Sequence, residues 1–323
     1  MKNLISIIIV NWNGKKWLKK CFDSLHSQTY NNFEVIFVDN ASSDDSVGYV
    51  EKNYTGTVII KSNKNLGFAG GVNLGIKNTN DGYILLMNND TWIDDDFLER
   101  ILFFYQNNNF DVVAPMENDY GNQAKEKNTI NIDILGHCIY QKYLSNKTNF
   151  YLCGVCLFFK KALYEETLGL DNNFLMYFEE VDWFWRLHLL NKTIASVDNL
   201  FIHHASVGSI SGGIKYESFL WRNQNTLQML LKNYACANLL WVLPLYFFQN
   251  IAEIIFFLLI LKPKIALSYF QGWWFNVKNI RKILINRSWV QKNRTVSDTE
   301  IFKKMYFGFA KFYHLANFLK NKS

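Results

Sequence analysis

Short, continuously apolar runs alternate with segments of helical periodicity over the first 115 residues. Uninterrupted apolar runs are typical of strands that are covered on both faces. We therefore expect five core strands, at residues 5–10, 33–38, 58–60, 83–87 and 112–114. The spacing of apolar residues between these runs predicts helices at residues 15–27, 44–52, 69–77 and 95–106. Such alternation predicts an α/β protein built on a mostly parallel central sheet with flanking helices.

The pattern is less regular beyond Pro115. Residues 116–150 are polar and rich in Asn without clear periodicity, as expected of an insertion or an acceptor-facing loop region. Regular patterning then predicts a strand at 151–160 and helices at 161–168 and 180–190. A pair of strands at 193–197 and 200–204 is expected to complete this part of the chain.

Polar residues and glycines follow the first four predicted strands. They are Asn11-Trp12-Asn13-Gly14, Asp39-Asn40-Ala41-Ser42, the segment from Asn63 through Asn65 and Gly67 to Gly70-Gly71, and Asn88-Asn89-Asp90-Thr91. Ligands of open α/β sheets bind beyond the carboxyl ends of the strands. Each residue alone is better explained by turn or cap chemistry, but together the four clusters indicate a nucleotide site.

The residue types suggest how a nucleotide would be bound. Asp39 could contact the base or ribose, the glycines would let the backbone approach the ligand, and Asp90 could hold a divalent cation on a diphosphate. The segment Gly67–Gly71 lacks the G-x-G-x-x-G spacing of dinucleotide-binding proteins, and the chain has no P-loop motif. A Rossmann oxidoreductase and a P-loop enzyme are therefore disfavoured.

Three carboxylates, Glu179, Glu180 and Asp182, are crowded at a predicted helix start beside Phe178 and Trp183. A helix N-terminus stabilises negative charge, so the cluster could be structural. Burial beside aromatic side chains would instead raise the carboxyl pKa values and suit a general base. We favour the catalytic interpretation.

Two further pairs are ambiguous. His203 and His204 end a predicted strand and point to opposite faces, so one of them at most can supply an imidazole to a site. Cys153 and Cys156 are likewise expected on opposite faces, and without a second pair they do not predict a zinc site. We assign both cysteines to the core.

Charge divides the chain unevenly, although its formal net charge is only +6. Residues 1–213 contain 18 Lys and Arg against 24 Asp and Glu, and residues 214–323 contain 16 against 4. We therefore expect a catalytic domain over 1–213 and a basic, aromatic helical region over 214–323. Five dispersed cysteines suit a reduced, cytosol-facing protein.

The basic region suggests an anionic partner. Residues 239–261 have one charged side chain, Glu253, and are followed by an aromatic and basic segment typical of a headgroup interface. We favour interfacial helices over a spanning or re-entrant segment and over an ordinary buried helical subdomain. Acidic lipid is expected as the partner, and nucleic acid is not.

In their order along the chain, these segments resemble a family 2 glycosyltransferase of the GT-A fold, in its rhamnosyltransferase-like branch. The resemblance is carried by the four strand-end clusters, Gly154 with the apolar run after it, Met176 to Trp183, His204 with Ser209, and Arg222-Asn223. It implies nucleotide-sugar binding by the strand-end residues Asn11, Asp39, Asn65, Gly67, Gly70, Gly71, Asn88 and Asn89.

The resemblance also implies the catalytic groups. Asn88-Asn89-Asp90 stands at the family's metal-binding D-x-D, so Asp90 and His204 would bind Mg²⁺ or Mn²⁺. Glu180 stands at the position of the catalytic base, with Asp182 as the alternative and Glu179 beside it. Two residues depart from the family pattern: Asn88 replaces the first Asp, and Glu180 replaces the usual Asp.

The implied activity is an inverting transfer of one sugar from a nucleotide-diphosphate sugar, dTDP-rhamnose or a UDP-sugar, to a hydroxyl of a saccharide acceptor. We expect a lipid-linked acceptor, a role in cell-surface polysaccharide synthesis, and a peripheral location on the inner face of the cell membrane. The chain lacks the Q-x-x-R-W element of processive synthases. A nucleotidyl- or phosphoryl-transferring enzyme and a catalytically silent membrane-docked binding protein remain the alternatives, and a homo-oligomer is left open.

Overall fold

The chain forms two compact units. The computed structural model describes residues 3–119, 128–142, 149–205 and 216–313. The first unit comprises Met1–Glu126, Leu152–Met176 and Lys192–Ser211, and the second comprises Lys127–Tyr151, Tyr177–Asn191 and Gly212–Ser323. The last boundary lies close to the predicted one at residue 213, but two earlier segments join the C-terminal residues. The functional division of the chain stays a prediction.

The first unit is built on an eight-stranded sheet with the order β3-β2-β1-β4-β9-β6-β10-β5. The strands are β1 (Ile5–Asn11), β2 (Phe33–Asp39), β3 (Val58–Lys61), β4 (Tyr83–Met87), β5 (Thr91–Ile93), β6 (Val112–Asp119), β9 (Cys156–Lys160) and β10 (Ile194–His204). Strands β1 to β4 are parallel, β9 is antiparallel to both its neighbours, and β5 is antiparallel to β10. The five predicted core strands are therefore confirmed within a mixed sheet.

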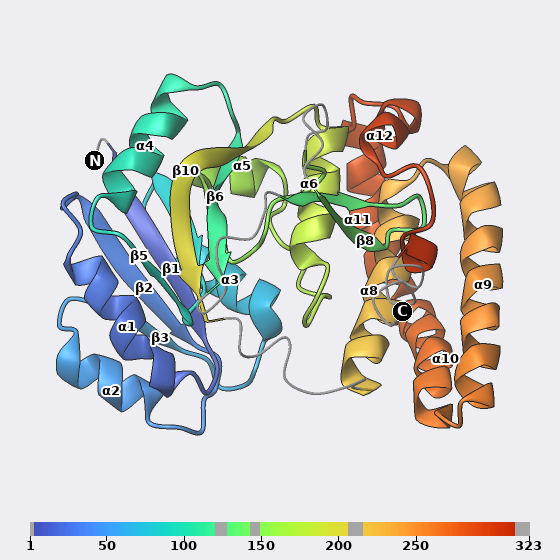
Figure 1. Ribbon diagram of the computed structural model, residues 1–323, viewed down its shortest axis with the longest axis horizontal. Coiled ribbons are helices and arrows are strands. Elements are labelled where there is room, and N and C mark those ends of the chain that lie inside the picture. The colour runs from blue at the N-terminus through green and yellow to red at the C-terminus, as the bar shows by residue number, and fades with distance from the viewer. Residues whose placement is uncertain (1–2, 120–127, 143–148, 206–215, 314–323) are drawn as a thin grey trace. The chain divides into compact units, whose positions relative to one another are not determined.

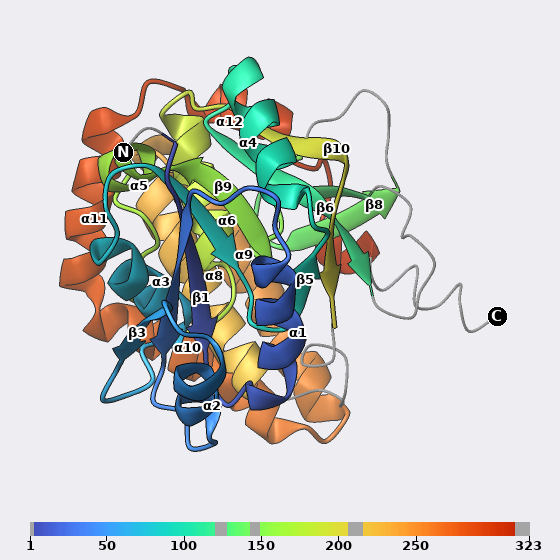
Figure 2. The ribbon, with the colours of Figure 1, turned by 90° about the vertical axis from the view of Figure 1, so that its left-hand side faces the viewer.

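Helices cover both faces of this sheet. They are α1 (Lys15–His26), α2 (Ser46–Asn53), α3 (Gly67–Lys77), α4 (Phe97–Asn107) and α5 (Lys161–Glu166). Alternate β1 residues Ile5, Ile7 and Ile9 join the core cluster that includes side chains of α1 and α4. Ile8 and Val10 face α3, so α1 and α3 lie on opposite sides of β1 (Figure 2).

Close packing of α3 on β1 requires glycine. A Cβ atom at Gly71 would lie 2.6 Å from a methyl carbon of Val10, and one at Gly75 would lie 2.6 Å from a methyl carbon of Ile8. Separations this short exclude a side chain unless the strand shifts. The glycines that the sequence suggested for ligand approach thus also bring the helix onto the sheet.

Strand β10 differs from its prediction. Residues 194–204 form one strand along β6 instead of the expected pair, with a register shift between Val197 and Phe201. Asn199 has a φ of 61°, a left-handed conformation that Asn tolerates better than most residues. The Asp198-Asn199 break in the apolar pattern thus marks an irregularity within one strand.

The described parts of the polar region after Pro115 contain strands that the sequence did not predict. Strand β6 continues to Asp119, and β7 (Asn128–Ile132) pairs with β8 (Cys138–Lys142) as an antiparallel hairpin in the second unit. The strand predicted at 151–160 begins only at Cys156. Asn and Gln reduce the strand signal here, although Ile130, Ile132 and Ile139 provide the alternation of a half-buried hairpin.

The second unit is mainly helical, with several of its long helices side by side (Figure 1). Its helices are α6 (Glu179–Leu189), α8 (Tyr216–Asn233), α9 (Cys236–Leu259), α10 (Pro263–Lys278), α11 (Ile280–Asn293) and α12 (Asp298–Lys304). The helical character predicted for the C-terminal region is confirmed.

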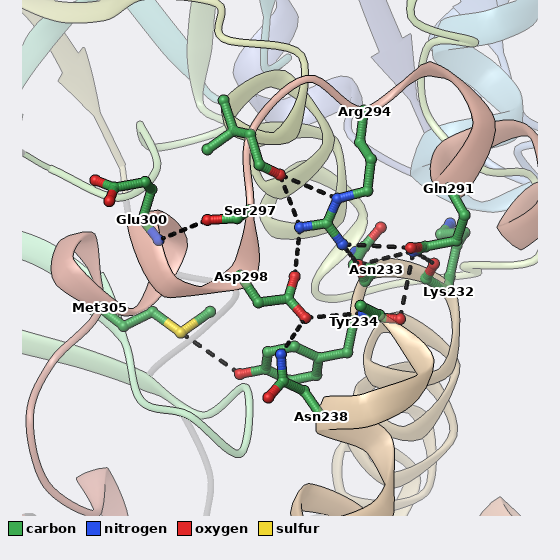
Figure 3. Close-up of polar contacts among 12 residues, drawn as sticks. Lys232, Asn233, Tyr234, Asn238, Gln291, Arg294, Ser297, Asp298, Glu300 and Met305 are labelled. Atoms are coloured by element: carbon green, nitrogen blue, oxygen red, sulfur yellow. Dashed lines mark hydrogen bonds and ion pairs between the residues drawn. The ribbon is translucent and has the colours of Figure 1, made fainter.

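Buried Asp298 ties three of these helices together (Figure 3). Its carboxylate accepts hydrogen bonds from the Ala235 amide at 2.8 Å and from Asn238 Nδ2 at 2.7 Å, at the start of α9. Arg294, just after α11, pairs with its other oxygen, and Ser297 caps α12 by accepting from the Glu300 amide. The polar residues of this segment therefore have a structural role.

Candidate functional site

The buried side chain of Asn11 joins three strand ends of the first unit. Its Nδ2 donates to Ser42 Oγ at 3.1 Å and lies 3.4 Å from Asp39 Oδ1, while its Oδ1 accepts from Asn89 Nδ2 at 2.6 Å. Asn11 is 0% exposed and Asp39 is 4% exposed. Parallel pairing of β1 with β2 and β4 brings these residues together, as the strand-end prediction required.

Asp39 also shapes the turn after β2. Its Oδ2 accepts from the Ser42 amide at 3.1 Å. Ser42 Oγ in turn accepts from the Asn13 amide at 2.9 Å, which closes the two turns against each other. Asp39 thus lies just beneath the surface, where its carboxylate orients the polar groups of Ser42 and Asn11.

The third cluster reaches the same edge through Asn40. Asn40 Nδ2 donates to the Gly67 carbonyl at 2.8 Å, and Asn65 Oδ1 accepts from the Gly67 amide at 2.8 Å. Gly67 has a φ of 73°, and a Cβ there would lie 2.2 Å from the Leu175 carbonyl oxygen. Gly67 therefore serves the turn into α3.

The structure explains the glycines at 67, 70 and 71 by close packing within the protein, without a ligand. Protein atoms already fill the space beside Gly67, Gly70 and Gly71: the Leu175 carbonyl, the Leu66 side chain and Val10 respectively. All three glycines are buried, whereas Asn65 is exposed. Of the four ligand candidates in this segment, Asn65 is thus the one with an exposed side chain.

Antiparallel pairing of β5 with β10 brings Asp90 to His204. His204 stands opposite Thr91, and the Ala205 amide donates to the Asp90 carbonyl at 3.0 Å. As a result, His204 Nε2 lies 3.3 Å from Asp90 Oδ1. The two predicted metal ligands, 114 positions apart, therefore share one site, and Asn89 connects it to Asn11.

Glu117 is a third member of this group that the sequence did not reveal. Its Oε1 lies 2.6 Å from His204 Nδ1. Burial lowers the pKa of His204, but the hydrogen bonds to Asp90 and Glu117 outweigh that effect and raise the pKa to about 9. Glu117 was hidden because it falls in the polar continuation of β6, outside every recognised motif.

The Asp90–His204 pair has the spacing of two ligands on one cation. Neighbouring ligands of an octahedral ion bound at about 2.1 Å lie roughly 3 Å apart. The 3.3 Å between Asp90 Oδ1 and His204 Nε2 is close to that value. Across the described residues, no three His, Cys, Asp or Glu side chains form a complete ligand set, so phosphate oxygens and water would have to supply the rest.

The adjacent pairs behave largely as their strand positions predict. His203 points to the other face, where its Nε2 lies 3.2 Å from Asp94 Oδ1 and its ring stacks on Trp92. Cys156 is buried in β9, but Cys153 precedes the strand and contacts Glu117 Oε2 at 3.6 Å. The expectation of a core position therefore holds for Cys156, and Cys153 is partly buried and packs against the same core cluster.

The acid cluster begins α6 in the second unit, after two residues in left-handed conformation. Tyr177 and Phe178 have φ values of 70° and 68°, which are unfavourable for aromatic residues. Helix α8 stabilises this turn, since Asn225 Nδ2 donates to the Tyr177 carbonyl at 2.8 Å and the Arg222 guanidinium lies 4.9 Å from the Tyr177 ring. Backbone strain of this kind is concentrated at functional sites.

The three acids of this cluster have different surroundings. Burial and the neighbouring carboxylate of Glu180 raise the pKa of Glu179 well above its ordinary value, and Glu179 Oε2 has no hydrogen-bond partner. Burial also raises the pKa of Glu180, which remains partly exposed. Glu180 is therefore the accessible carboxylate with raised basicity.

Asp182 is enclosed by structural partners. It is 0% exposed, and its Oδ2 lies 2.8 Å from Lys232 Nζ and 3.0 Å from the Arg186 guanidinium. Its Oδ1 accepts from Asn233 Nδ2 at 3.0 Å. Two cations and an amide thus engage both oxygens of Asp182, which ties α6 to α8 and leaves Glu180 as the better base candidate. Ser209, quoted for the resemblance, lies outside the described residues.

Comparison with known proteins identifies the family. A family model described as Glycosyl transferase family 2 matches residues 6–168, about half of the chain. WfaP of Escherichia coli, a UDP-Glc:alpha-D-GlcNAc-diphosphoundecaprenol beta-1,3-glucosyltransferase, is 26% identical over 70% of this chain and 86% of its own length. The glycosyltransferase GlyA of Streptococcus pneumoniae is 26% identical over 45% of this chain, and that match spans only 21% of GlyA.

Solved structures agree at the level of the fold. TarS of Staphylococcus aureus in complex with UDP-GlcNAc matches with a TM-score of 0.57 at 17% identity, over 84% of this chain and 79% of that one. GalNAc-T7 with UDP, GalNAc and Mn²⁺ matches with a TM-score of 0.59 at 11% identity, over 72% and 48% of the two chains. The predicted α/β GT-A fold is thereby confirmed, and by its sequence match the chain belongs to glycosyl transferase family 2.

Proposed function

We propose that this protein transfers one sugar from a nucleotide-diphosphate sugar to a hydroxyl group of a saccharide acceptor, with inversion at the sugar carbon. The observation that carries the proposal is the continuous polar cluster from Asp39 through Asn11 and Asn89 to Asp90 and His204. It joins a buried carboxylate to a cation-binding pair along one edge of the sheet. A carboxylate at one end and a pair that can hold a cation at the other end are expected of a site that binds a nucleoside and the diphosphate attached to it.

Asp90 and His204 would hold a Mg²⁺ or Mn²⁺ ion together with the diphosphate of the donor. When bound, the ion supplies positive charge that stabilises the departing nucleoside diphosphate. Asn65, Asn88 and Asn89 would position the donor by hydrogen bonds, and Asp39 would act on the nucleoside through the Asn11 and Ser42 groups that it orients. GalNAc-T7 was solved with UDP and Mn²⁺, which supports this assignment by likeness of fold only.

Glu180 is proposed as the general base that takes the proton of the acceptor hydroxyl. A carboxylate whose pKa is raised by burial accepts a proton more readily near neutral pH than an ordinary one. Burial and the neighbouring Glu180 carboxylate raise the pKa of Glu179 well above its ordinary value, which disfavours a second negative charge beside Glu180. Asp182 is excluded from the proposal because both its oxygens are engaged.

The acceptor is proposed to be lipid-linked, as the undecaprenol-bound acceptor in the name of WfaP suggests. The donor is proposed to be dTDP-rhamnose or a UDP-sugar, and the expected product is a cell-surface polysaccharide. A lipid-linked acceptor requires the enzyme to work at a membrane surface, which we propose is the inner face of the cell membrane. The role of the C-terminal helices follows from this requirement.

Helix α9 presents a long apolar face for that purpose. Within the described part of the chain, α9 is the one helix that is long and apolar enough to cross a bilayer. Only 28% of its most apolar 18-residue stretch is buried inside the protein, so most of that stretch is open to a partner. Leu240, Phe248 and Leu259 are 80%, 74% and 76% exposed. Lys262 and Lys264 follow directly at its end, which favours a surface of anionic lipid.

The opposite face of α9 is fixed to the second unit. Glu253 pairs with Lys311 at 2.6 Å, accepts from Gln249 Nε2 at 2.8 Å and is hydrogen-bonded by Tyr269. A spanning helix would have to carry this ion pair into hydrocarbon, at considerable cost. We therefore propose that α9 lies in the interface instead of crossing it.

The experiment that tests the function has two stages. First, the melting temperature of the full chain is measured with UDP, dTDP and GDP, each with Mn²⁺ and with chelator. A ligand that binds only the native state raises the melting temperature, so one diphosphate should stabilise the protein and chelation should reduce the effect. Second, the matching sugar donor is supplied with an undecaprenyl-diphosphate-linked sugar. Stabilisation by none of the diphosphates would refute the proposal.

A further inference from the structure

Glu117 and His204 lie diagonally across two neighbouring strands. In the parallel pairing of β6 with β10, Glu117 stands opposite Ile202, two residues before His204. Residues two apart on a strand share a face, so Glu117 and His204 project to the same side of the sheet. The 2.6 Å contact between Glu117 Oε1 and His204 Nδ1 is therefore set by strand register.

The contact determines how the imidazole ring is presented. A carboxylate only accepts hydrogen bonds, so the Nδ1 atom of His204 must carry the proton that it shares with Glu117. Nε2, on the far side of the ring, lies 3.3 Å from Asp90 Oδ1 and shares a proton with it, so a cation bound between the two would take the place of that proton. The geometry thus directs Nε2 to the place where Asp90 would bind a cation.

The Glu117 side chain is itself oriented. Its second oxygen, Oε2, lies 3.6 Å from Cys153 Sγ, so each carboxylate oxygen has a contact. Carboxylates that orient metal-binding histidines in this way also increase the basicity of the ligating nitrogen, and their loss typically lowers metal affinity 10- to 100-fold. Glu117 has the position that such a role requires, with one contact at each carboxylate oxygen.

We propose that Glu117 is a positioning residue, which holds His204 with Nε2 facing Asp90 and thereby sets the affinity of the site for a divalent cation. The inference rests on the cation site of the proposed function and extends it to a residue outside every motif of the sequence. Glu117 acts through His204 and touches neither donor nor cation.

The same strand provides a matched control. His203 Nε2 lies 3.2 Å from Asp94 Oδ1, so a second carboxylate–imidazole contact exists one residue away on the opposite face. Asp94→Asn removes a charge from that pair as Glu117→Gln does from the first. A general effect of charge or strand stability should appear in both variants.

The test measures cation affinity directly in the full-length protein. Free Mn²⁺ is followed by electron paramagnetic resonance during titration, with UDP at saturation and dTDP in a parallel series. We expect Glu117→Ala to raise the Mn²⁺ dissociation constant about 10- to 100-fold. Glu117→Gln, whose amide oxygen can still accept from Nδ1, should recover much of that loss. Asp94→Asn should stay within about twofold of the unmodified protein, and thermal unfolding should verify that each variant is folded.

The outcomes separate this inference from the function on which it rests. If Asp90→Asn and His204→Ala weaken Mn²⁺ binding while Glu117→Ala does not, the positioning role is wrong and the cation site stands. If Asp90→Asn and His204→Ala bind Mn²⁺ unchanged, the cation site of the proposed function is wrong and the inference falls with it. A loss of Mn²⁺ affinity in Asp94→Asn as large as that in Glu117→Ala would show a general strand effect and would also overturn the positioning role.

Discussion

Two carboxylates in the same helical turn should respond in opposite ways to neutral substitution. Asp182 is enclosed by Lys232 at 2.8 Å and the Arg186 guanidinium at 3.0 Å, whereas Glu180 is partly exposed and has a raised pKa. We predict that Asp182→Asn destabilises the fold. Glu180→Gln should preserve the fold and abolish sugar transfer.

The loss of stability expected for Asp182→Asn follows from the burial of its two charged partners. Lys232 and Arg186 have side chains that are 1% and 3% exposed, so Asp182→Asn would remove a buried negative charge that pairs with both cations. Removing one partner of a buried ion pair costs about 3–5 kcal/mol. A loss of 1 kcal/mol lowers the melting temperature of a folded unit of roughly 150–250 residues by about 2–4 °C. The melting temperature of Asp182→Asn should therefore fall by roughly 6–20 °C.

Glu180→Gln has no such penalty, because it neutralises a carboxyl group whose charged form burial already disfavours. Its melting temperature should equal or exceed that of the unmodified protein, and nucleoside diphosphate should stabilise it equally well. Thermal unfolding and a sugar-transfer assay on the two variants show which carboxylate stabilises the fold and which one is needed for transfer. An Asp182→Asn protein of unchanged stability that fails to transfer sugar would refute the structural role of Asp182 and make it the base.

Three further predictions concern other parts of the chain. Glu179 binds its proton more tightly in the folded state than in the unfolded state, so its ionisation destabilises the fold as pH rises above about 4.5; Glu179→Gln should therefore gain stability over the unmodified protein with rising pH, and parallel stability curves would contradict this. Gly71→Ala should cost about 1–3 kcal/mol because its Cβ would lie 2.6 Å from Val10, and Val10→Ala in the same chain should restore part of that loss in thermal unfolding; additive losses would show that the clash is absent. Replacing exposed Phe248 and Leu259 of α9 with Glu should abolish flotation with vesicles containing phosphatidylglycerol while leaving nucleotide binding intact, whereas self-association that these changes remove would show that the face binds a second copy.

The sequence predicted the parts of the molecule that local patterning determines. Continuous apolar runs located β1 to β4, and polar strand ends located Asn11, Asp39 and Asn89 at one edge. Parallel strands place their carboxyl ends together, so the Asn11 contacts follow from element order alone. Element type and the strand-end cluster were therefore accessible without coordinates.

The contacts that the sequence missed depend on distant pairing. Glu117 meets His204 only because β6 and β10 pair in one register, and a one-residue slip would turn Glu117 to the other face. The sequence kept Asp182 as an alternative base because it could not show that Asp182 pairs with Lys232. This buried partner lies in another helix, 50 positions further along the chain. A charge cluster in sequence does not reveal which of its members is neutralised in space.

The use of amides at the strand ends explains why this site can be buried before any ligand binds. Asn11 and Asn89 satisfy each other at 2.6 Å without adding charge, whereas carboxylates at both positions would repel at that separation. Asn88 continues the pattern and stands in place of the first carboxylate of the family's D-x-D, so Asp90 is the acidic residue left in that motif. In the proposed cation site, affinity would then depend more strongly on His204 and on the residue that orients its ring. The substitution that makes the motif atypical is thus the reason to expect that Glu117, two strands further along the chain than Asn88, matters for binding of the donor's diphosphate.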